Sequence, residues 1–415
     1  MSDLHQLGPL ISIQKGKPPK SFEANTANTQ AYLSPEYLRG IAPPTFAERF
    51  PNSLMATCGD VVLLWDGSNA GEAFRAKPGI VASTMAVIRP DHSFDLGYFF
   101  HALKWVEPHL KSQTNGTGIP HVDRHVLEQV AVYLPAKLDQ AKIAEVLDTL
   151  DVAIQGTEAV VAKLRAMKQG LLHDLLTRGI DANGDLRPPQ PEAPHLYHQT
   201  PLGWLPKEWE VREVQDLLAP VDPAMRSGPF GSALLKEELV SQGIPFLGID
   251  NVHVERFDRD YKRFVTSSKF QQLRRYAVRP NDLMITIMGT VGRCCLVPHD
   301  VGDALSSKHT WTISLDQAKY SPYLAMLQVN YCDWVLRHFS KDQQGGTMSA
   351  IRSETIRSTL LPVPHPAEQA SIEAILMKLA SRSRDELALL DKLRLQKSGL
   401  MDDLLTGRVP VTPLL

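Results

Sequence analysis

The sequence predicts an α/β protein in which two similar β-rich regions are joined by two long helices that pair antiparallel. Three observations support this prediction. The segment KLRAMKQGLLHDLLTRG at 163–179 returns as KLRLQKSGLMDDLLTGR at 392–408, with ten of seventeen positions identical. Apolar residues recur with a seven-residue period in the sequence that leads into both segments, and the period continues within them. A proline-rich stretch separates the two halves of the 415-residue chain, which is long enough for at least two domains.

The internal repeat covers more than the end of each helix. At the same offset of 229 residues, QAKIAEVLDTLD at 140–151 aligns with QASIEAILMKLA at 369–380. Further upstream the offset drifts, so that GDVVLLW at 59–65 matches NDLMITI at 281–287. Each copy is therefore a variable β-rich region followed by a more constant helix. Two copies are fewer than a stacked repeat array needs, which indicates a single duplication.

The two long helices carry an apolar seam with the spacing of a coiled coil. About 40 residues in each would give a rod of roughly 60 Å. One such helix cannot bury its seam alone, whereas two related helices can bury each other's; the alternative is that each packs on its own domain as an ordinary core helix. Ser383 and Glu386 interrupt the second seam. The seam residues are Ile143, Leu147, Leu150, Ile154, Val161 and Leu164 in the first helix, and Ile372, Leu376, Leu379, Leu390 and Leu393 in the second.

These patterns divide the chain into a β-rich domain, a helix, a connector, a second β-rich domain and a second helix. The connector contains six prolines and shows neither helical nor strand periodicity, which predicts a stiff, extended segment that Trp204 and Trp209 pin to the second domain. Each helix is expected to end near a glycine, Gly179 or Gly407. The predicted boundaries are 1–135, 136–180, 181–208, 209–364 and 365–408.

Short strands bounded by turn-forming residues predict α/β domains with a twisted sheet. The candidate strands are 60–65, 84–88, 129–134, 244–248, 283–288, 293–297 and 310–315.

The sequence contains no recognisable catalytic pattern. It has no Gly-rich phosphate loop with the Lys-Ser/Thr ending, and its four cysteines lack the paired spacing of a zinc site. GPFGSAL at 228–234 is interpreted as a turn whose glycines permit special backbone angles. We therefore expect no metal or cofactor in this chain, and a binding or scaffolding role. The absence of a long apolar run and of a signal-peptide pattern predicts a cytoplasmic protein without membrane contact.

Charge gives a weaker indication of the partner. The formal net charge is −2, but residues 256–279 hold eight Arg or Lys and two Asp. Such a segment fits an electrostatic footprint on DNA, and it fits a solvated surface equally well.

Several phrases resemble the specificity (S) subunits of type I restriction–modification enzymes. RSGPFGSALLKEELVSQGIPFLGIDNV at 226–252 is similar to the opening of a target recognition domain, and GWLPKEWEV at 203–211 to the entry into the second one. LPAKLDQAKIAEVLDTLD at 134–151 is similar to the exit into a conserved helix. The segment 11–20 only faintly echoes the opening at 226–252, which leaves the boundaries of the first domain less defined.

The resemblance implies two target recognition domains at opposite ends of an antiparallel coiled coil with pseudo-twofold symmetry. Such a subunit binds double-stranded DNA at a bipartite, asymmetric target and performs no chemistry. It holds two modification subunits, which carry S-adenosylmethionine, and restriction subunits, which use Mg-ATP. If both domains read one side of the duplex, the half-sites should lie about 34 Å apart.

Polar and basic loop residues are the candidates for DNA contact. Glycine–threonine loops often only form turns, and Arg and Lys mostly contact phosphate, so both alternatives stay open. The candidates are Asn115, Gly116 and Thr117, the equivalent Gln344, Gly345, Gly346 and Thr347, then Ser307, Lys308 and His309, and Arg274, Arg275 and Arg279.

Two competing functions remain at this point: a coiled-coil adaptor that binds only proteins, and an enzyme with an unrecognised site. The repeated Gly170 and Gly399 suggest either a close approach between the helices or simple shared ancestry of the two copies.

Overall fold

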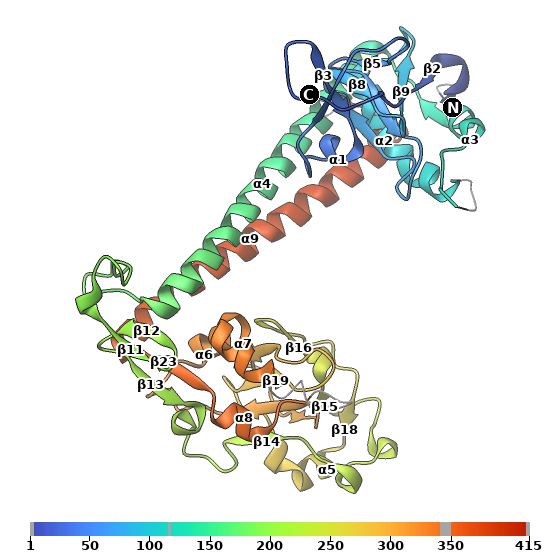
Figure 1. Ribbon diagram of the computed structural model, residues 1–415. Coiled ribbons are helices and arrows are strands. Elements are labelled where there is room, and N and C mark those ends of the chain that lie inside the picture. The colour runs from blue at the N-terminus through green and yellow to red at the C-terminus, as the bar shows by residue number, and fades with distance from the viewer. Residues whose placement is uncertain (1–3, 115–117, 341–349, 412–415) are drawn as a thin grey trace. The chain divides into compact units, whose positions relative to one another are not determined.

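The computed structural model describes residues 4–114, 118–340 and 350–411. The chain divides into two compact units, Met1–Val161 with Glu386–Leu415 (unit 1) and Ala162–Asp385 (unit 2). Both units combine helices and strands, which agrees with the predicted α/β class (Figure 1). Among the described helices, none is both long and apolar enough to cross a membrane.

Unit 1 contains two four-stranded sheets where the sequence predicted one. The first sheet has the strand order β2-β9-β6-β7, and the second has the order β4-β3-β8-β5 with β3 and β8 parallel. The short pair β1–β10 lies outside them. The strands are β1 (Leu4–Gln6), β2 (Ile11–Lys15), β3 (Thr29–Leu33), β4 (Thr45–Glu48), β5 (Met55–Ala56), β6 (Val61–Leu64), β7 (Ala73–Arg75), β8 (Gly79–Val81), β9 (Met85–Pro90) and β10 (Ala131–Tyr133), and the short helices are α1 (Pro35–Leu38) and α3 (Arg124–Gln129).

Unit 2 repeats this plan. Its first sheet, β14-β22-β19-β20, corresponds strand by strand to β2-β9-β6-β7, and its second sheet, β18-β15-β21, contains the parallel pair β15–β21. The strands are β11 (Tyr197–Thr200), β12 (Gly203–Pro206), β13 (Glu210–Glu213), β14 (Met225–Ser227), β15 (Ile244–Leu247), β16 (Val252–His253), β17 (Arg256–Phe257), β18 (Phe264–Val265), β19 (Leu283–Thr286), β20 (Cys294–Leu296), β21 (Leu305–Ser306), β22 (Thr310–Ile313) and β23 (Leu360–Val363).

One glycine in each unit explains the faint echo between residues 11–20 and 226–252. Gly16 follows β2 and Gly228 follows β14. A Cβ atom on Gly16 would lie 2.2 Å from the carbonyl oxygen of Ala82, and one on Gly228 would lie 2.1 Å from that of Ser306. Only glycine allows the backbone to pass this close to the neighbouring strand. This close backbone approach is repeated in the two units although most of the surrounding residues differ.

Helices cover the cores of both units. Helix α2 (Leu96–Ser112) begins at Asp95, whose carboxylate accepts a hydrogen bond from the backbone N–H of Tyr98. Helix α6 (Pro322–Tyr331) begins in the same way at Ser321, which is followed by a proline. Both arrangements satisfy backbone donors that the first turn of a helix leaves unpaired. The remaining helices of unit 2 are α5 (Ser267–Gln272), α7 (Asp333–Ser340) and α8 (Ser353–Arg357).

The two long helices, α4 (Lys137–Thr177) and α9 (Pro366–Leu404), each contribute to both units. The core of unit 1 takes Ile143 and Leu147 from the start of α4, and Leu404 from the end of α9. The core of unit 2 takes Leu172, Leu175 and Leu176 from the end of α4, and Ile372 and Leu376 from the start of α9. The helices therefore run antiparallel within each unit. Of the predicted seam residues, Ile143, Leu147, Val161, Leu164, Ile372, Leu376 and Leu390 are buried, and Leu150, Ile154, Leu379 and Leu393 are half-buried.

Ion pairs accompany the apolar packing within each unit. In unit 1, Lys397 pairs with Asp151, and Arg394 pairs with Glu158 at 2.7 Å. In unit 2, the Glu368 carboxylate accepts hydrogen bonds from the Trp209 indole at 3.0 Å and from the backbone N–H of Ile180 at 2.9 Å, and it pairs with Arg187. Glu368 thus ties the start of α9 to the segment that follows α4.

The expectation of an extended connector is wrong for residues 197–206. There β11 and β12 form an antiparallel hairpin in which Thr200 faces Gly203. The sequence pattern did not predict this hairpin because its strands lack alternating apolar residues. Trp209 is buried in the core of unit 2, as expected, whereas Trp204 is about half exposed and is not among the described residues of that core.

Both long helices end beside a glycine with a left-handed backbone, as predicted. Gly179 has φ +63° and Gly407 has φ +70°. Gly179 is also enclosed, because a Cβ atom there would meet the Glu368 carboxylate and the Trp209 ring. A side chain at Gly179 would therefore be both strained and obstructed.

The idea that Gly170 and Gly399 allow close helix approach is wrong. Both are exposed, and a Cβ atom on either would have no described atom within 4 Å apart from the neighbouring backbone of its own helix. Packing within the chain therefore gives no reason for a glycine at these two helical positions.

We expect Gly170→Ala and Gly399→Ala each to stabilise the protein by about 0.5–1 kcal/mol, because alanine costs less backbone entropy in a helix. Equilibrium denaturation measures the change. Gly179→Ala is the matched control and should destabilise. A loss of stability in the first two variants would contradict the open surroundings of these glycines.

Candidate nucleic-acid interface

The predicted contact residues Ser307, Lys308 and His309 form the turn between β21 and β22. Ser307 is buried, and its carbonyl oxygen accepts hydrogen bonds from the backbone N–H groups of Thr310 and Gly228. Lys308 is exposed and His309 is half-buried. The serine therefore shapes the turn, while Lys308 and His309 present the polar groups.

Burial lowers the pKa of His309, and the nearby charges of Lys308 and Arg263 lower it further. The ring is therefore held neutral, and a neutral imidazole offers one hydrogen-bond donor and one acceptor. Arg263, which lies directly before β18, is close enough to His309 to affect its pKa. It was not among the predicted contacts, because its nearness to His309 depends on how the sheets fold.

Unit 1 has a turn of the same geometry between β8 and β9. Met85 donates its backbone N–H to the carbonyl oxygen of Ala82 at 2.9 Å, as Thr310 does to Ser307 at 3.2 Å. The matching puts Ser83 and Thr84 at the places of Lys308 and His309. One turn therefore presents two hydroxyl groups where the other presents an ammonium group and an imidazole.

Most of the basic segment 256–279 is neutralised by carboxylates. Five of its eight basic side chains form ion pairs, three of them with partners far away in the sequence. Exposed pairs of this kind add little stability, but they reduce the positive potential that the composition suggested. The pairs are Arg256–Asp258, Arg259–Asp300, Lys262–Asp260, Arg263–Asp250 and Lys269–Glu238.

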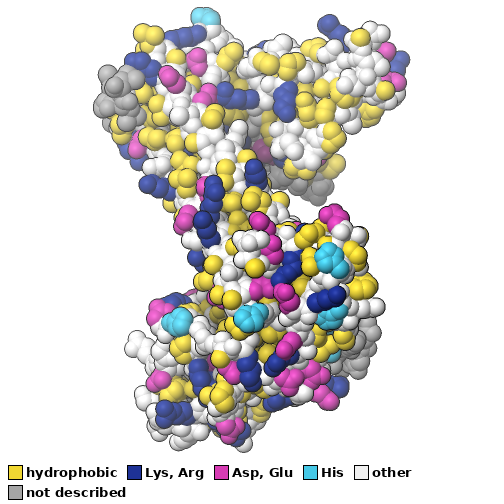
Figure 2. All heavy atoms as spheres, turned by 90° about the vertical axis from the view of Figure 1, so that its left-hand side faces the viewer, with side chains coloured by type: hydrophobic (Ala, Val, Ile, Leu, Met, Phe, Trp, Pro, Cys, Tyr) yellow, Lys and Arg dark blue, Asp and Glu magenta, His cyan; other side chains and the backbone are white. Residues whose placement is uncertain are grey.

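Arg274 and Arg275 keep their charge available. Both are exposed in the short turn that follows α5, and neither has an ion-pair partner among the described residues. The Arg275 guanidinium lies 5.4 Å from the centre of the Tyr276 ring. The surface drawn in Figure 2 likewise mixes basic and acidic side chains instead of gathering one sign.

Arg279 belongs to a buried polar network. Arg226 and Asp282 form an ion pair with both side chains 2% exposed. The Ser314 hydroxyl donates to Asp282 at 2.5 Å and accepts from Arg226 at 3.0 Å and from Arg279 at 3.2 Å. Arg226 lies in β14, Asp282 directly before β19 and Ser314 directly after β22. Arg226 also donates to the carbonyl oxygen of Ala277, two residues after Arg275.

Replacing Asp282 by Asn should destabilise the protein by about 3–5 kcal/mol, because Arg226 would be left as a buried, unpaired charge. Chemical denaturation monitored by circular dichroism measures the loss. The matched control is Asp300→Asn, which breaks an exposed pair and should cost less than about 1 kcal/mol. Similar small losses in both variants would show that the buried pair has no structural role.

The remaining predicted contacts cannot be placed. Asn115, Gly116 and Thr117, and Gln344, Gly345, Gly346 and Thr347, lie outside the described residues.

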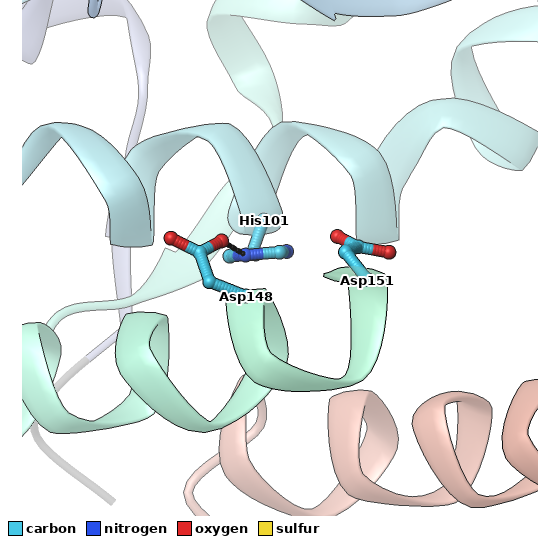
Figure 3. A group of neighbouring side chains, drawn as sticks. All are labelled: His101, Asp148 and Asp151. Atoms are coloured by element: carbon cyan, nitrogen blue, oxygen red, sulfur yellow. Dashed lines mark hydrogen bonds and ion pairs between the residues drawn. The ribbon is translucent and has the colours of Figure 1, made fainter. Parts of the chain in front are cut away.

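One cluster of possible metal ligands occurs in the described part of the chain, and it is already charge-balanced. His101 projects from α2 between Asp148 and Asp151 of α4 (Figure 3). Asp148 pairs with Arg75 and Asp151 pairs with Lys397. A divalent cation would compete with two adjacent basic groups for these carboxylates. The cluster is therefore better explained as a set of polar contacts between α2 and α4.

His101 is fully buried, and its Nε2–H group donates to the Asp148 carboxylate at 2.6 Å. Its Nδ1 atom has no hydrogen-bond partner in the part of the chain that the structure describes. Burial lowers the pKa of His101, and the Asp148 hydrogen bond offsets this only in part. The neutral ring is therefore the form that the fold accommodates.

Stability should consequently fall as the pH drops below about 6.5, because the unfolded chain then takes up a proton that folded His101 resists. His101→Asn, which introduces the residue found at the repeat-equivalent position 330, should make the melting temperature less sensitive to acid. Thermal melts at about pH 7.5 and about pH 5.5 compare the two proteins. An equal decrease in both would contradict the assignment.

Comparison with known proteins agrees with the repeated architecture. A family model described as "Type I restriction modification DNA specificity domain" matches residues 3–165. The type I restriction enzyme MjaVIII specificity subunit of Methanocaldococcus jannaschii is 27% identical over 416 residues, covering 99% of this chain and 93% of the relative. The EcoBI specificity subunit of Escherichia coli is 19% identical over 271 residues, covering 64% of this chain and 55% of that protein.

A solved structure has the same fold. The crystal structure of the S subunit of the type I restriction–modification system from M. genitalium superposes with a TM-score of 0.62, covering 97% of this chain and 95% of that one at 13% identity.

Proposed function

Since the chain belongs to the family of type I restriction–modification specificity subunits, we propose that it binds double-stranded DNA at a bipartite, asymmetric target and holds the catalytic subunits of the system there. Each half of the target is read by one of the two repeated α/β domains.

The observation that carries this proposal is the difference between two turns of the same geometry. The Lys308–His309 turn and the Ser83–Thr84 turn follow equivalent parallel strands. Lysine favours guanine acceptors or phosphate, whereas hydroxyl groups accept and donate without strong preference. Two domains with one backbone plan and different side chains at this turn would read different half-sites.

Among the predicted contacts of unit 2, few residues offer a positive charge that is not already paired. Lys308, Arg274 and Arg275 are the predicted contacts that are both exposed and free of ion-pair partners among the described residues. Arginine and lysine at such positions contact phosphate more often than bases. His309 lies beside Lys308 and supplies hydrogen-bonding groups suited to base edges.

The partners follow from the same proposal. Two modification subunits bind the chain and bring S-adenosylmethionine, and restriction subunits bring Mg-ATP. The chain itself is non-catalytic and has no cofactor of its own. Its two long helices, each shared between the two units, provide the frame on which these subunits assemble.

An adaptor that binds only proteins is the second candidate, and the neutralised basic segment favours it. Five ion pairs in residues 256–279 remove much of the charge that a DNA footprint would use. An adaptor would show weak binding to any duplex and little dependence on salt, whereas a DNA-binding chain releases counterions.

Arg274→Ala with Arg275→Ala should weaken binding of the assembled complex to any duplex and reduce the salt slope, log affinity against log salt, by about 1–2. Fluorescence anisotropy over a salt series measures both quantities. The control Arg256→Ala with Arg259→Ala removes two ion-paired arginines from the same segment and should change the slope less. Equal slopes in all three proteins would remove Arg274 and Arg275 from the interface.

Methylation mapping tests the function as a whole. Cells that carry the intact system should show adenine methylation at a split, asymmetric motif, and deletion of this chain should abolish it. Lys308→Ser with His309→Thr, which copies the unit 1 turn, should alter or abolish methylation by changing one half of the motif. A methylation pattern that survives deletion of the chain would refute the proposed role.

A further inference from the structure

An ion pair borders the β8–β9 turn of unit 1. Lys15 Nζ lies 2.6 Å from a carboxylate oxygen of Asp66, and the two side chains are 47% and 27% exposed. The backbone N–H of Asp66 donates to the carbonyl oxygen of Thr84 at 3.1 Å. That of Gly16, directly after Lys15, donates to the carbonyl oxygen of Met85 at 2.9 Å. Hydrogen bonds of the backbone therefore hold both members of the pair beside the turn.

The backbone plan does not require this ion pair, because unit 2 has the same plan without it. Ser227 precedes the close-approach glycine of unit 2 as Lys15 precedes that of unit 1. Met288 lies two residues after β19, as Asp66 lies two residues after the corresponding strand β6. A serine and a methionine cannot form an ion pair, yet the turn between β21 and β22 keeps its geometry. Exposed pairs also add little stability, so folding alone does not account for the pair in unit 1.

The carboxylate of Asp66 restricts what the turn of unit 1 can contact. Under the proposed function this turn faces DNA, whose phosphate groups are negatively charged and would repel a carboxylate. The major-groove edges of the bases are different, since cytosine and adenine present amino groups there. A carboxylate beside this turn is therefore unfavourable against the DNA backbone and favourable against a base that offers an amino group.

The two members of the pair match the two bases of one G·C base pair. Lysine donates to O6 and N7 of guanine, and aspartate accepts from N4 of cytosine. Guanine O6 and cytosine N4 are hydrogen-bonded to each other, so they lie about 2.9 Å apart. That separation is close to the 2.6 Å between Lys15 Nζ and the Asp66 carboxylate. Because the ion pair already exists in the free chain, its two groups need little ordering when DNA binds.

An A·T base pair fits the same two groups less well. It also presents an amino group beside a carbonyl oxygen, which are N6 of adenine and O4 of thymine. In this base pair N7 lies on the side of the amino group, and the thymine methyl group lies on the side of the carbonyl oxygen. The Lys15 ammonium would then meet a methyl group in place of a second acceptor.

We propose that Lys15 and Asp66 together recognise one G·C base pair in the half-site that unit 1 reads. Lys15 donates to the guanine, and Asp66 accepts from the cytosine. The inference rests on the proposed function and adds the identity of a base pair, which that function leaves open. Ser227 and Met288 carry neither charge, so unit 2 reads its half-site without an equivalent pair.

Asp66→Asn tests the assignment, because it keeps the size of the side chain while it removes the charge and adds a donor. An amide side chain favours adenine over cytosine. The preference for G·C over A·T at one position of one half-site should therefore fall by about tenfold or more. Lys15→Gln should weaken the preference at the same position. This position should lie in the half-site that Lys308→Ser with His309→Thr leaves unchanged.

Competition binding measures these preferences. The full chain, assembled with the modification subunits of its system, is titrated with duplexes that carry each base pair in turn at every position of the mapped motif. Glu158→Gln is the matched control, because it breaks an exposed ion pair of unit 1 between α4 and α9. It should leave every base preference unchanged. Thermal melts should show that all three variants fold, since each loses only an exposed pair.

Unchanged preferences in both Asp66→Asn and Lys15→Gln would overturn the assignment. A folded Asp66→Asn variant that binds every duplex more weakly by the same factor would overturn it as well, because recognition of a base pair predicts an effect at one position. If the unsubstituted complex binds all duplexes alike, the proposed function itself fails. A selective unsubstituted complex with unaltered variants removes only the base assignment, so the two failures are distinguishable.

Discussion

The structure depends on the burial of two apolar seams that no single helix could bury. The start of α4 and the end of α9 complete the core of unit 1, and the end of α4 with the start of α9 complete that of unit 2. Because each unit needs both helices, the chain must return after building the second α/β domain. The hydrophobic effect thereby couples segments more than 200 residues apart in the sequence.

Buried polar groups add specific contacts that the burial of apolar side chains alone would not determine. At the start of α9, Glu368 accepts hydrogen bonds from Trp209 and from a backbone N–H group, and it pairs with Arg187. In unit 2, Arg226 and Asp282 form a buried ion pair. Such buried pairs contribute little net stability compared with apolar contacts, but breaking them is costly. Arg226 also donates to the carbonyl oxygen of Ala277, two residues after Arg275.

Duplication followed by divergence accounts for the combination of sameness and difference in the two halves. Strand order and the close approach at Gly16 and Gly228 are shared. The side chains at the β8–β9 and β21–β22 turns are not. The side chains that keep the backbone plan alike in the two halves are therefore not the ones that differ at these turns.

The sequence by itself determined the duplication, the two helices with their seams and terminal glycines, and five of the eight strands in the sheets β2-β9-β6-β7 and β14-β22-β19-β20, because these depend on local periodicity and turn chemistry. Strands β2, β7 and β14 were not predicted. Only the tertiary structure decided which basic residues stay free. Arg259 and Lys269 pair with Asp300 and Glu238, which lie 41 and 31 residues away in the sequence, and Arg279 belongs to the Asp282 network. It likewise decided that the connector holds a hairpin and that Gly170 and Gly399 face open space. Ion pairing and exposure depend on distances between segments that are remote in sequence, and periodicity carries no information about those distances.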